Sequence, residues 1–96
     1  MKEQDYQKKI VKYLESKGAY VVKVITASKK GVPDVLACYK GRFIAIEVKT
    51  PTTMNNASEL QKYNLEKIRD AGGVAMISCE ASDLDYTLKR IDDEHD

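Results

Sequence analysis

Two apolar runs joined by the dipeptide Lys40-Gly41 restrict the fold of this chain more than any other feature of its sequence. Residues 34–39 and 43–49 are rich in aliphatic and β-branched side chains, and each run has the length of one strand. A two-residue connection that ends in glycine is typical of a tight turn between antiparallel strands. The sequence therefore predicts a β-hairpin in the middle of the chain.

The hairpin turn also predicts which residues face each other. If Lys40-Gly41 is the turn, counting back along both strands places Asp34 opposite Glu47. Opposed side chains in an antiparallel pair hold their Cβ atoms about 4.5 to 5.5 Å apart, and two like charges at that distance repel unless something neutralises them. A cation would do so, and Mg²⁺ prefers a few carboxylates together with water and phosphate oxygens. We therefore expect a metal site at Asp34 and Glu47.

Lys49 follows Glu47 by two residues, so the period of a strand turns both side chains to the same face. Asp34, Glu47 and Lys49 together have the groups that phosphodiester hydrolysis requires. That reaction needs a metal ion, an activated water and a cation that positions the nucleophile or offsets developing charge. The alternative is a solvated strand face with a salt bridge between Lys49 and one acid. The predicted alignment of Asp34 with Glu47 favours the catalytic interpretation.

The rest of the chain predicts an α/β domain of order α-β-β-β-α-β-α, with a central mixed four-stranded sheet flanked by helices. Helices are expected from the N-terminus to Gly18, over Ser58–Ala71 and over Ser82–Ile91, and further strands over Tyr20–Thr26 and Val74–Ser78. The helix between the last two strands makes a parallel crossover of them.

Composition favours one domain over residues 1–96 and leaves a nucleic-acid partner open. The chain has 96 residues, 43% of them hydrophobic, and its 16 Lys and Arg nearly balance its 15 Asp and Glu. Cys38 and Cys79 lie in apolar runs and are expected to be buried thiols of a reducing compartment. No apolar stretch has the length of a membrane span, and the N-terminus is polar, so we expect a cytoplasmic protein.

Pro33-Asp34 followed by Glu47-Val48-Lys49 resembles the motif of the PD-(D/E)XK nuclease superfamily. Within it the chain is similar to the VRR-NUC family through three segments, which are Gly31–Asp34, Ile44–Lys49 and the Ser58-x-x-Gln61 helix that runs to Gly72-Gly73. The similarity covers nearly the whole chain. It implies a restriction-endonuclease-like core and, by likeness to archaeal-type Holliday junction resolvases, a Mg²⁺- or Mn²⁺-dependent endonuclease that cleaves branched DNA as a homodimer.

The resemblance also implies a role for each site residue. Asp34 and Glu47 bind the metal with the main-chain carbonyl of Val48, and Lys49 contacts the water or the scissile phosphate. Gln61 corresponds to a helix-borne glutamine beside the site. Its alternative is structural, because Ser58-x-x-Gln61 is also a capping box, in which Gln61 returns to the backbone at the start of its helix.

The family has a further glutamate on its first helix. Glu3 projects into the centre of the predicted apolar stripe of that helix, whereas Glu15 projects away from it. Glu3 is therefore our candidate site residue and a possible metal ligand. Gln7, one turn later on the same face, is a further candidate, and a solvated helix end is the alternative for Glu3.

Basic residues form two clusters. Ser28, Lys29 and Lys30 lie in the loop before Gly31 and are expected to contact DNA, with a mobile surface loop as the alternative. The cluster on the first helix, which contains Lys8, Lys9 and Lys12, is expected to face solvent.

Three functions are consistent with these sequence features. The first is a homodimeric Holliday junction resolvase, because a junction needs two symmetric nicks. The second is a flap or nicking endonuclease with the same site. The third is a non-catalytic DNA-binding module with the nuclease fold, which has no need of two opposed acids.

Overall fold

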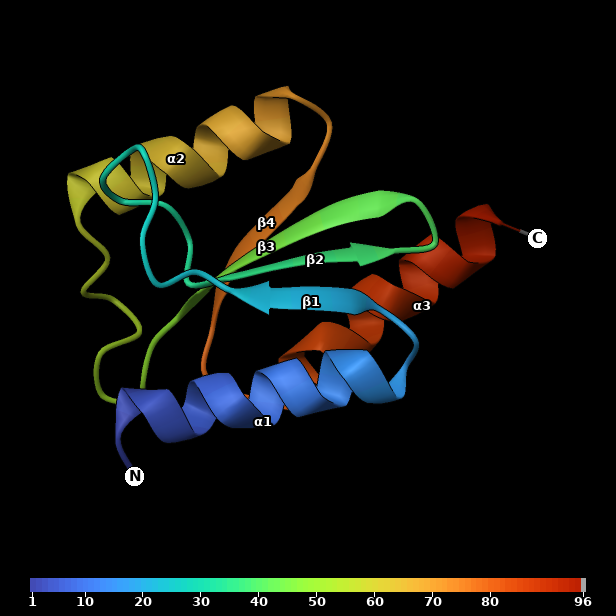
Figure 1. Cartoon of the computed structure of the whole chain (residues 1–96), viewed down its shortest axis with the longest axis horizontal. Helices are drawn as coiled ribbons and strands as arrows, with labels where there is room; N and C mark the ends of the chain where they lie inside the picture. Colours follow the sequence, from blue (N-terminus) through green and yellow to red (C-terminus); the bar gives the residue numbers. More distant parts are fainter. Residues whose placement is uncertain (96) are drawn as a thin grey trace.

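The computed structural model describes residues 1–95 and shows a mixed sheet with helices on both faces (Figure 1). The strands, in their order across the sheet, are β1 (Tyr20–Lys23), β2 (Val35–Tyr39), β3 (Arg42–Val48) and β4 (Val74–Ser78). The helices are α1 (Glu3–Ser16), α2 (Glu59–Asp70) and α3 (Asp85–Glu94), with a 3₁₀ turn η1 (Ala81–Leu84) before α3. The predicted α/β class and element order are confirmed. Within residues 1–95 no helix combines the length and the apolar character that crossing a bilayer requires.

The hairpin of β2 and β3 has the predicted register. Its pairs run from Tyr39 with Arg42 at the turn to Val35 with Ile46. Asp34 directly precedes the last of these pairs on one strand and Glu47 directly follows it on the other. Lys40 and Gly41 have φ angles of 47° and 80°, and positive φ at both central residues is the geometry of a type I′ turn. The turn therefore brings Asp34 into line with Glu47.

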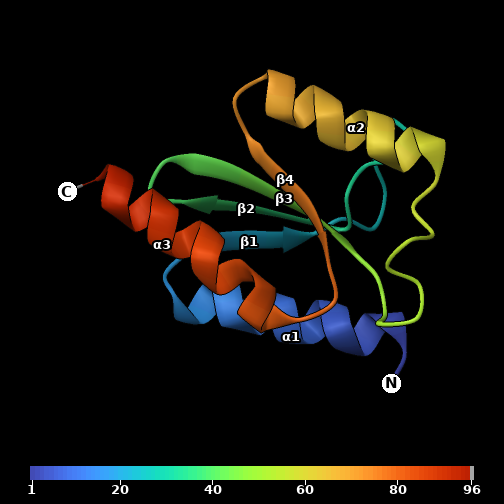
Figure 2. The same ribbon diagram turned by 180° about the vertical axis from the view of Figure 1, so that it is seen from behind.

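Alternation along β3 divides the core between the two faces of the sheet. Ile44, Ile46 and Val48 pack with residues of α1 and α3, whereas Ala45 packs with α2 and β4. The two opposite views in Figures 1 and 2 show α1 and α3 together on one side of the sheet and α2 on the other. Strands β3 and β4 are parallel, as expected from the crossover through α2. Glu47 shares the face of Ala45 and therefore points to the α2 side.

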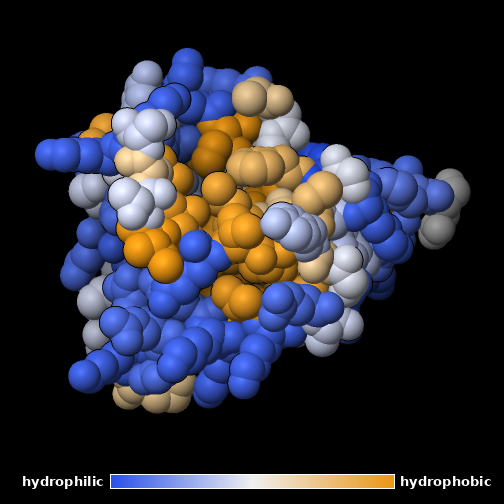
Figure 3. All heavy atoms as spheres, in the orientation of Figure 1, coloured by the Kyte–Doolittle hydropathy of each residue, from blue (hydrophilic) through white to orange (hydrophobic). Residues whose placement is uncertain are grey.

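Helix α2 covers only part of the sheet face on which it lies. The uncovered apolar surface lies over β1, β2 and the start of β3, in the orange area at the centre of Figure 3, and it is lined by Tyr20, Val22, Leu36, Cys38 and Phe43. We call it the open sheet face. Cys38 is exposed there and Cys79 is partly exposed, so the prediction of buried thiols is wrong for Cys38. The apolar run around Cys38 packs on one face only, and strand alternation turns this side chain to the other.

Several element ends differ from the prediction. Strand β1 stops at Lys23 instead of Thr26, β2 begins one residue after Asp34, and β3 ends one residue before Lys49. Asp34 and Lys49 therefore lie just outside the regular ladder. Position 96 of the acidic tail lies outside the described residues.

The acidic C-terminal segment continues α3 to Glu94, beyond its predicted end. Asp92 accepts hydrogen bonds from the Tyr39 hydroxyl at 2.6 Å and from the Lys40 ammonium at 2.7 Å. Glu94 pairs with Arg42 at 2.5 Å. These contacts fasten the end of α3 to the hairpin turn and explain why the helix is longer than its apolar pattern indicates.

Candidate active site

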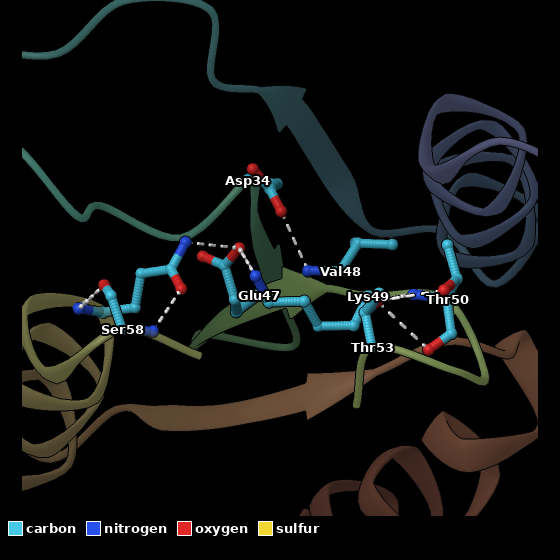
Figure 4. A network of polar contacts seen from close by, with 8 residues as sticks. Asp34, Glu47, Val48, Lys49, Thr50, Thr53 and Ser58 are labelled. Atoms are coloured by element: carbon cyan, nitrogen blue, oxygen red, sulfur yellow. Dashed lines mark hydrogen bonds and ion pairs between the residues drawn. The ribbon is translucent and has the colours of Figure 1, made fainter. Parts of the chain in front are cut away.

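Asp34, Glu47 and Lys49 lie together where β2 begins and β3 ends (Figure 4). The main chain holds both segments in place, because the Val24 amide donates to the Asp34 carbonyl at 2.8 Å and the Lys49 amide donates to the Ser78 carbonyl at 3.0 Å. Val24, directly after β1, and Ser78, in β4, thus hold Asp34 and Lys49 in place, although these two residues lie outside the regular ladder. The predicted convergence of two acids and one ammonium is present in the fold.

Glu47 is the most buried charged residue of this group, with 2% of its surface exposed. Its Oε2 accepts a hydrogen bond from Gln61 Nε2 at 3.1 Å and lies 3.9 Å from Lys49 Nζ. Its Oε1 is buried and has no hydrogen-bond partner among the described residues. A buried polar atom without a partner is costly, so this oxygen is suited to a ligand that the protein itself does not supply.

The surroundings of Glu47 favour its protonated form in the metal-free protein. Burial is the largest cause, followed by the neighbouring Asp34 carboxyl, and together they raise the pKa of Glu47 to about 8. The charge of Lys49 opposes this rise, and the charge of Glu3 adds to it. A carboxyl with this pKa needs a cation beside it to stay ionised at neutral pH.

Asp34 is partly exposed, and one of its oxygens is used by the fold. Its Oδ2 accepts a hydrogen bond from the Val48 amide at 2.9 Å, as Figure 4 shows. The contact ties the start of β2 to the last residue of β3. It aligns the Asp34 carboxyl with the main chain of Val48, whose carbonyl is the third predicted metal ligand.

Gln61 makes both the capping contacts and a contact with the site, which the sequence presented as alternatives. Its Oε1 accepts a hydrogen bond from the Ser58 main-chain amide at 2.9 Å, and its own main-chain amide donates to the Ser58 hydroxyl oxygen at 3.1 Å, which completes a capping box at the start of α2. At the same time its Nε2 donates to Glu47. An amide side chain has both an acceptor and two donors, so the cap fixes the orientation in which Gln61 reaches the acid.

Helix α1 brings its first residue toward the site. Glu3 is half-buried, and its negative charge contributes to the raised pKa of Glu47. Gln7 is buried, with 7% of its surface exposed, and its Oε1 has no hydrogen-bond partner among residues 1–95. Glu15 is exposed near the far end of α1. Of the three first-helix candidates, Glu3 is the one that acts electrostatically on Glu47.

The basic loop lies against α2. The Lys30 carbonyl accepts a hydrogen bond from Asn64 Nδ2 at 3.1 Å. Gly31 has a φ of 79°, and a Cβ added there would lie 2.8 Å from Leu60 Cγ. Since Leu60 directly precedes Gln61, this packing holds the loop close to the site, while the side chains of Ser28, Lys29 and Lys30 stay exposed.

The turn after Lys49 is a feature that we did not predict. The Thr50 amide donates to Thr53 Oγ1 at 2.8 Å, and the two hydroxyl oxygens lie 2.9 Å apart. Figure 4 shows this turn beside Lys49. The run Thr50-Pro51-Thr52-Thr53 was a signal for it, because threonine hydroxyls near a proline often close such turns.

The carboxylates alone do not make a complete metal cage. Within residues 1–95 no three His, Cys, Asp or Glu side chains are placed to hold an ion together. The possible role of Glu3 as a further metal ligand stays a prediction. Two carboxylates and the Val48 carbonyl, completed by water and substrate oxygens, are the kind of partial shell that Mg²⁺ accepts, and the partnerless Oε1 of Glu47 fits it.

Comparisons with known proteins bear on the family and the fold. Residues 1–94 match the protein family described as "Archaeal holliday junction resolvase (hjc)". A protein of Aquifex aeolicus (strain VF5) described as a UPF0102 protein is 34% identical over 68 residues, which are 71% of this chain and 66% of that protein. The chain thus spans just under two thirds of that relative.

A solved structure described as a VRR_NUC domain superposes on this chain with a TM-score of 0.74. It is 24% identical in sequence, and the match covers 91% of this chain and 94% of that chain. The likeness confirms the VRR-NUC-like fold that the sequence predicted.

Proposed function

Since the chain belongs to the archaeal Holliday junction resolvase family of structure-specific nucleases, we propose that it is a Mg²⁺- or Mn²⁺-dependent endonuclease for branched DNA. We propose further that it works as a homodimeric Holliday junction resolvase in the cytoplasm. The observation that carries the proposal is the buried Glu47 carboxyl, which is aligned with Asp34, has Lys49 Nζ 3.9 Å from its Oε2, and has no hydrogen-bond partner for its Oε1 among residues 1–95.

Asp34, Glu47 and the Val48 carbonyl are the groups that would hold the metal. A bound divalent ion polarises a phosphoryl group and lowers the pKa of water. Lys49, with 12% of its side chain exposed, is confined close to Glu47 and carries the positive charge that orients the attacking water or offsets charge on the phosphate. Gln61 holds Glu47 in one orientation through its Nε2 donor.

A homodimer follows from the need for two nicks at symmetric positions, which a closed two-fold dimer supplies. The open sheet face offers the apolar area for contact with a second copy, since Tyr20 is 75%, Phe43 44% and Val22 41% exposed. Measurement of mass in solution tests this assignment. We expect a dimer for the wild type and a monomer for Val22→Glu/Phe43→Glu, and a monomeric wild type would exclude it.

The activity is tested with labelled four-way junctions, flaps and linear duplexes in Mg²⁺, with EDTA as the blank. We expect paired, symmetric nicks in the junction. Glu47→Gln and Lys49→Gln should each lower the single-turnover rate by roughly 10²–10³-fold or more. Glu66→Gln, which removes an exposed carboxylate on α2, is the matched control and should cleave normally.

The products separate the competing functions. Cuts in flaps or single nicks in duplexes with no paired junction cuts would indicate a flap or nicking enzyme with the same residues. If no substrate is cleaved, and wild type and Glu47→Gln bind DNA equally, the chain is a binding module and the nuclease proposal is wrong.

A further inference from the structure

A basic groove lies between α1 and β1, outside the site described above. It has a volume of about 300 Å³ and is lined by Lys8, Val11, Lys12, Glu15 and Lys23. Its three lysines are exposed. We call it the lysine groove. Two of its lysines belong to the first-helix cluster that the sequence analysis expected only to face solvent, and the third comes from a different element.

The lysines of this groove have no acidic partner among residues 1–95, as is also true of other exposed lysines such as Lys17 and Lys67. Ion pairs within residues 1–95 occupy basic residues of the hairpin turn, of the site and of α2, namely Lys40, Arg42, Lys49, Lys62 and Arg69. Within the same residues, Lys8, Lys12 and Lys23 have no carboxylate oxygen within 4.0 Å, although Glu15 lies at the groove. Three ammonium groups against one carboxylate leave the groove with a local positive charge.

The groove also begins next to the candidate active site. Lys23 ends β1 and pairs with Val35, the residue that follows Asp34. The next residue of that strand, Val24, donates its amide to the Asp34 carbonyl. Lys23 therefore lies opposite the neighbour of a proposed metal ligand, with its side chain on the α1 face of the sheet like that of Val35, while the Asp34 side chain points to the α2 face.

Along α1 the groove is regular. Lys8 and Lys12 are four residues apart and lie on one face of the helix, about 6 Å apart along its axis. One strand of B-DNA carries a phosphate about every 3.4 Å along the axis, so this spacing is close to two such steps, which separate alternate phosphates of one backbone. Glu15, one turn beyond Lys12, marks the end of the positive stretch.

We propose that the lysine groove binds the sugar-phosphate backbone of a duplex arm that leads away from the cleaved position. The inference rests on the proposed function, because it takes branched DNA as the substrate. A DNA arm is the polyanion that the proposed site would bring to this end of the sheet, where Lys23 pairs with the neighbour of Asp34. Contacts of this kind position the substrate without reading its sequence.

The test measures binding without cleavage. Fluorescence anisotropy in EDTA gives the dissociation constant of a four-way junction over a range of salt concentrations, with long and with truncated arms. The variant is Lys8→Gln/Lys12→Gln/Lys23→Gln. The matched control removes the same charge at three other exposed lysines and is Lys17→Gln/Lys67→Gln/Lys89→Gln.

Each lost phosphate contact lowers the slope of log affinity against log salt by about 0.9. We expect the groove variant to have a slope roughly 2 to 3 units shallower than the control with long arms, and no difference from it with truncated arms. The triple Lys→Arg variant should keep the wild-type slope. At saturating enzyme in Mg²⁺ the groove variant should cleave at the wild-type single-turnover rate.

Equal slopes for the groove variant and the control would overturn the proposal, as would an effect that persists with truncated arms. A groove variant that loses binding to vesicles containing phosphatidylserine but keeps its DNA slope would assign the groove to a membrane and also overturn it. The slope is measured without metal, so it stays informative if the protein cleaves nothing. A protein that cleaves junctions normally but shows no slope difference would refute the groove alone.

Discussion

Replacement of Glu47 by glutamine should stabilise the metal-free protein at alkaline pH. The wild-type carboxyl is 2% exposed, and its pKa is raised to about 8 by burial and by the neighbouring Asp34. In the unfolded chain the same group titrates near the ordinary value of 4.5. Glutamine keeps the shape and remains neutral, so Glu47→Gln removes the cost of ionisation in the folded state.

The sign follows from the proton balance. Between pH 4.5 and about 8 the folded state holds a proton that the unfolded state has released. The free energy of unfolding of the wild type therefore falls as pH rises through this window. Each pKa unit corresponds to about 1.4 kcal/mol, so between pH 5 and pH 9 the wild type should lose about 4 kcal/mol relative to Glu47→Gln.

Urea unfolding in EDTA at pH 5, 7 and 9 measures this difference. The stability gap between Glu47→Gln and the wild type should widen steadily with pH, and saturating Mg²⁺ at pH 9 should stabilise the wild type but not the variant. Glu66→Gln, exposed on α2, is the control and should follow the wild type. A gap that is constant across the pH range would show that Glu47 is ionised in the metal-free fold and would refute the reasoning.

Two further pairs of variants test the supports of the site. Ser58→Ala should lower the free energy of unfolding by about 1 kcal/mol through loss of the cap. Gln61→Ala should lower the free energy of unfolding by a similar amount and should also reduce the cleavage rate by roughly 10–100-fold. Equal cleavage rates of the two variants would exclude a role of Gln61 at the acid. Gly31→Ala should lower the free energy of unfolding, measured by thermal unfolding, by about 2–3 kcal/mol, because the positive φ of residue 31 adds to a clash with Leu60. Gly18 also has a positive φ, but an added Cβ there meets nothing within 4 Å, so Gly18→Ala should lower the free energy of unfolding by only about 1–2 kcal/mol. Equal losses would show that the loop is not packed on α2.

The central part of the site could be predicted because it depends on local rules. A two-residue turn at Lys40-Gly41 fixes the register of the hairpin, and the register alone brings Asp34 into line with Glu47. The direction of Lys49 follows from strand alternation. None of these steps requires knowledge of how distant elements pack.

Features that depend on packing between elements were missed or misjudged. The lysine groove joins α1 to Lys23, and no pattern within either element shows that they lie side by side. The exposure of Cys38 depends on how much of the sheet α2 covers. The length of α3 depends on contacts of Asp92 with the hairpin turn, which are made across the fold.

Gln61 shows why two interpretations of one motif need not exclude each other. The sequence offered a capping box or a contact with the site, because each assigns one partner to the side chain. In the structure the acceptor oxygen of the amide is bound by the Ser58 backbone, and this leaves only the donor nitrogen to face Glu47. A cap that fixes the start of α2 thereby also determines which atom meets the acid. A glutamate at position 61 could still accept from the Ser58 amide, but it would present a second carboxylate to Glu47 in place of a donor. A capping box accepts glutamine or glutamate at this position, so the preference for glutamine over glutamate follows only from its contact with the buried Glu47 of β3.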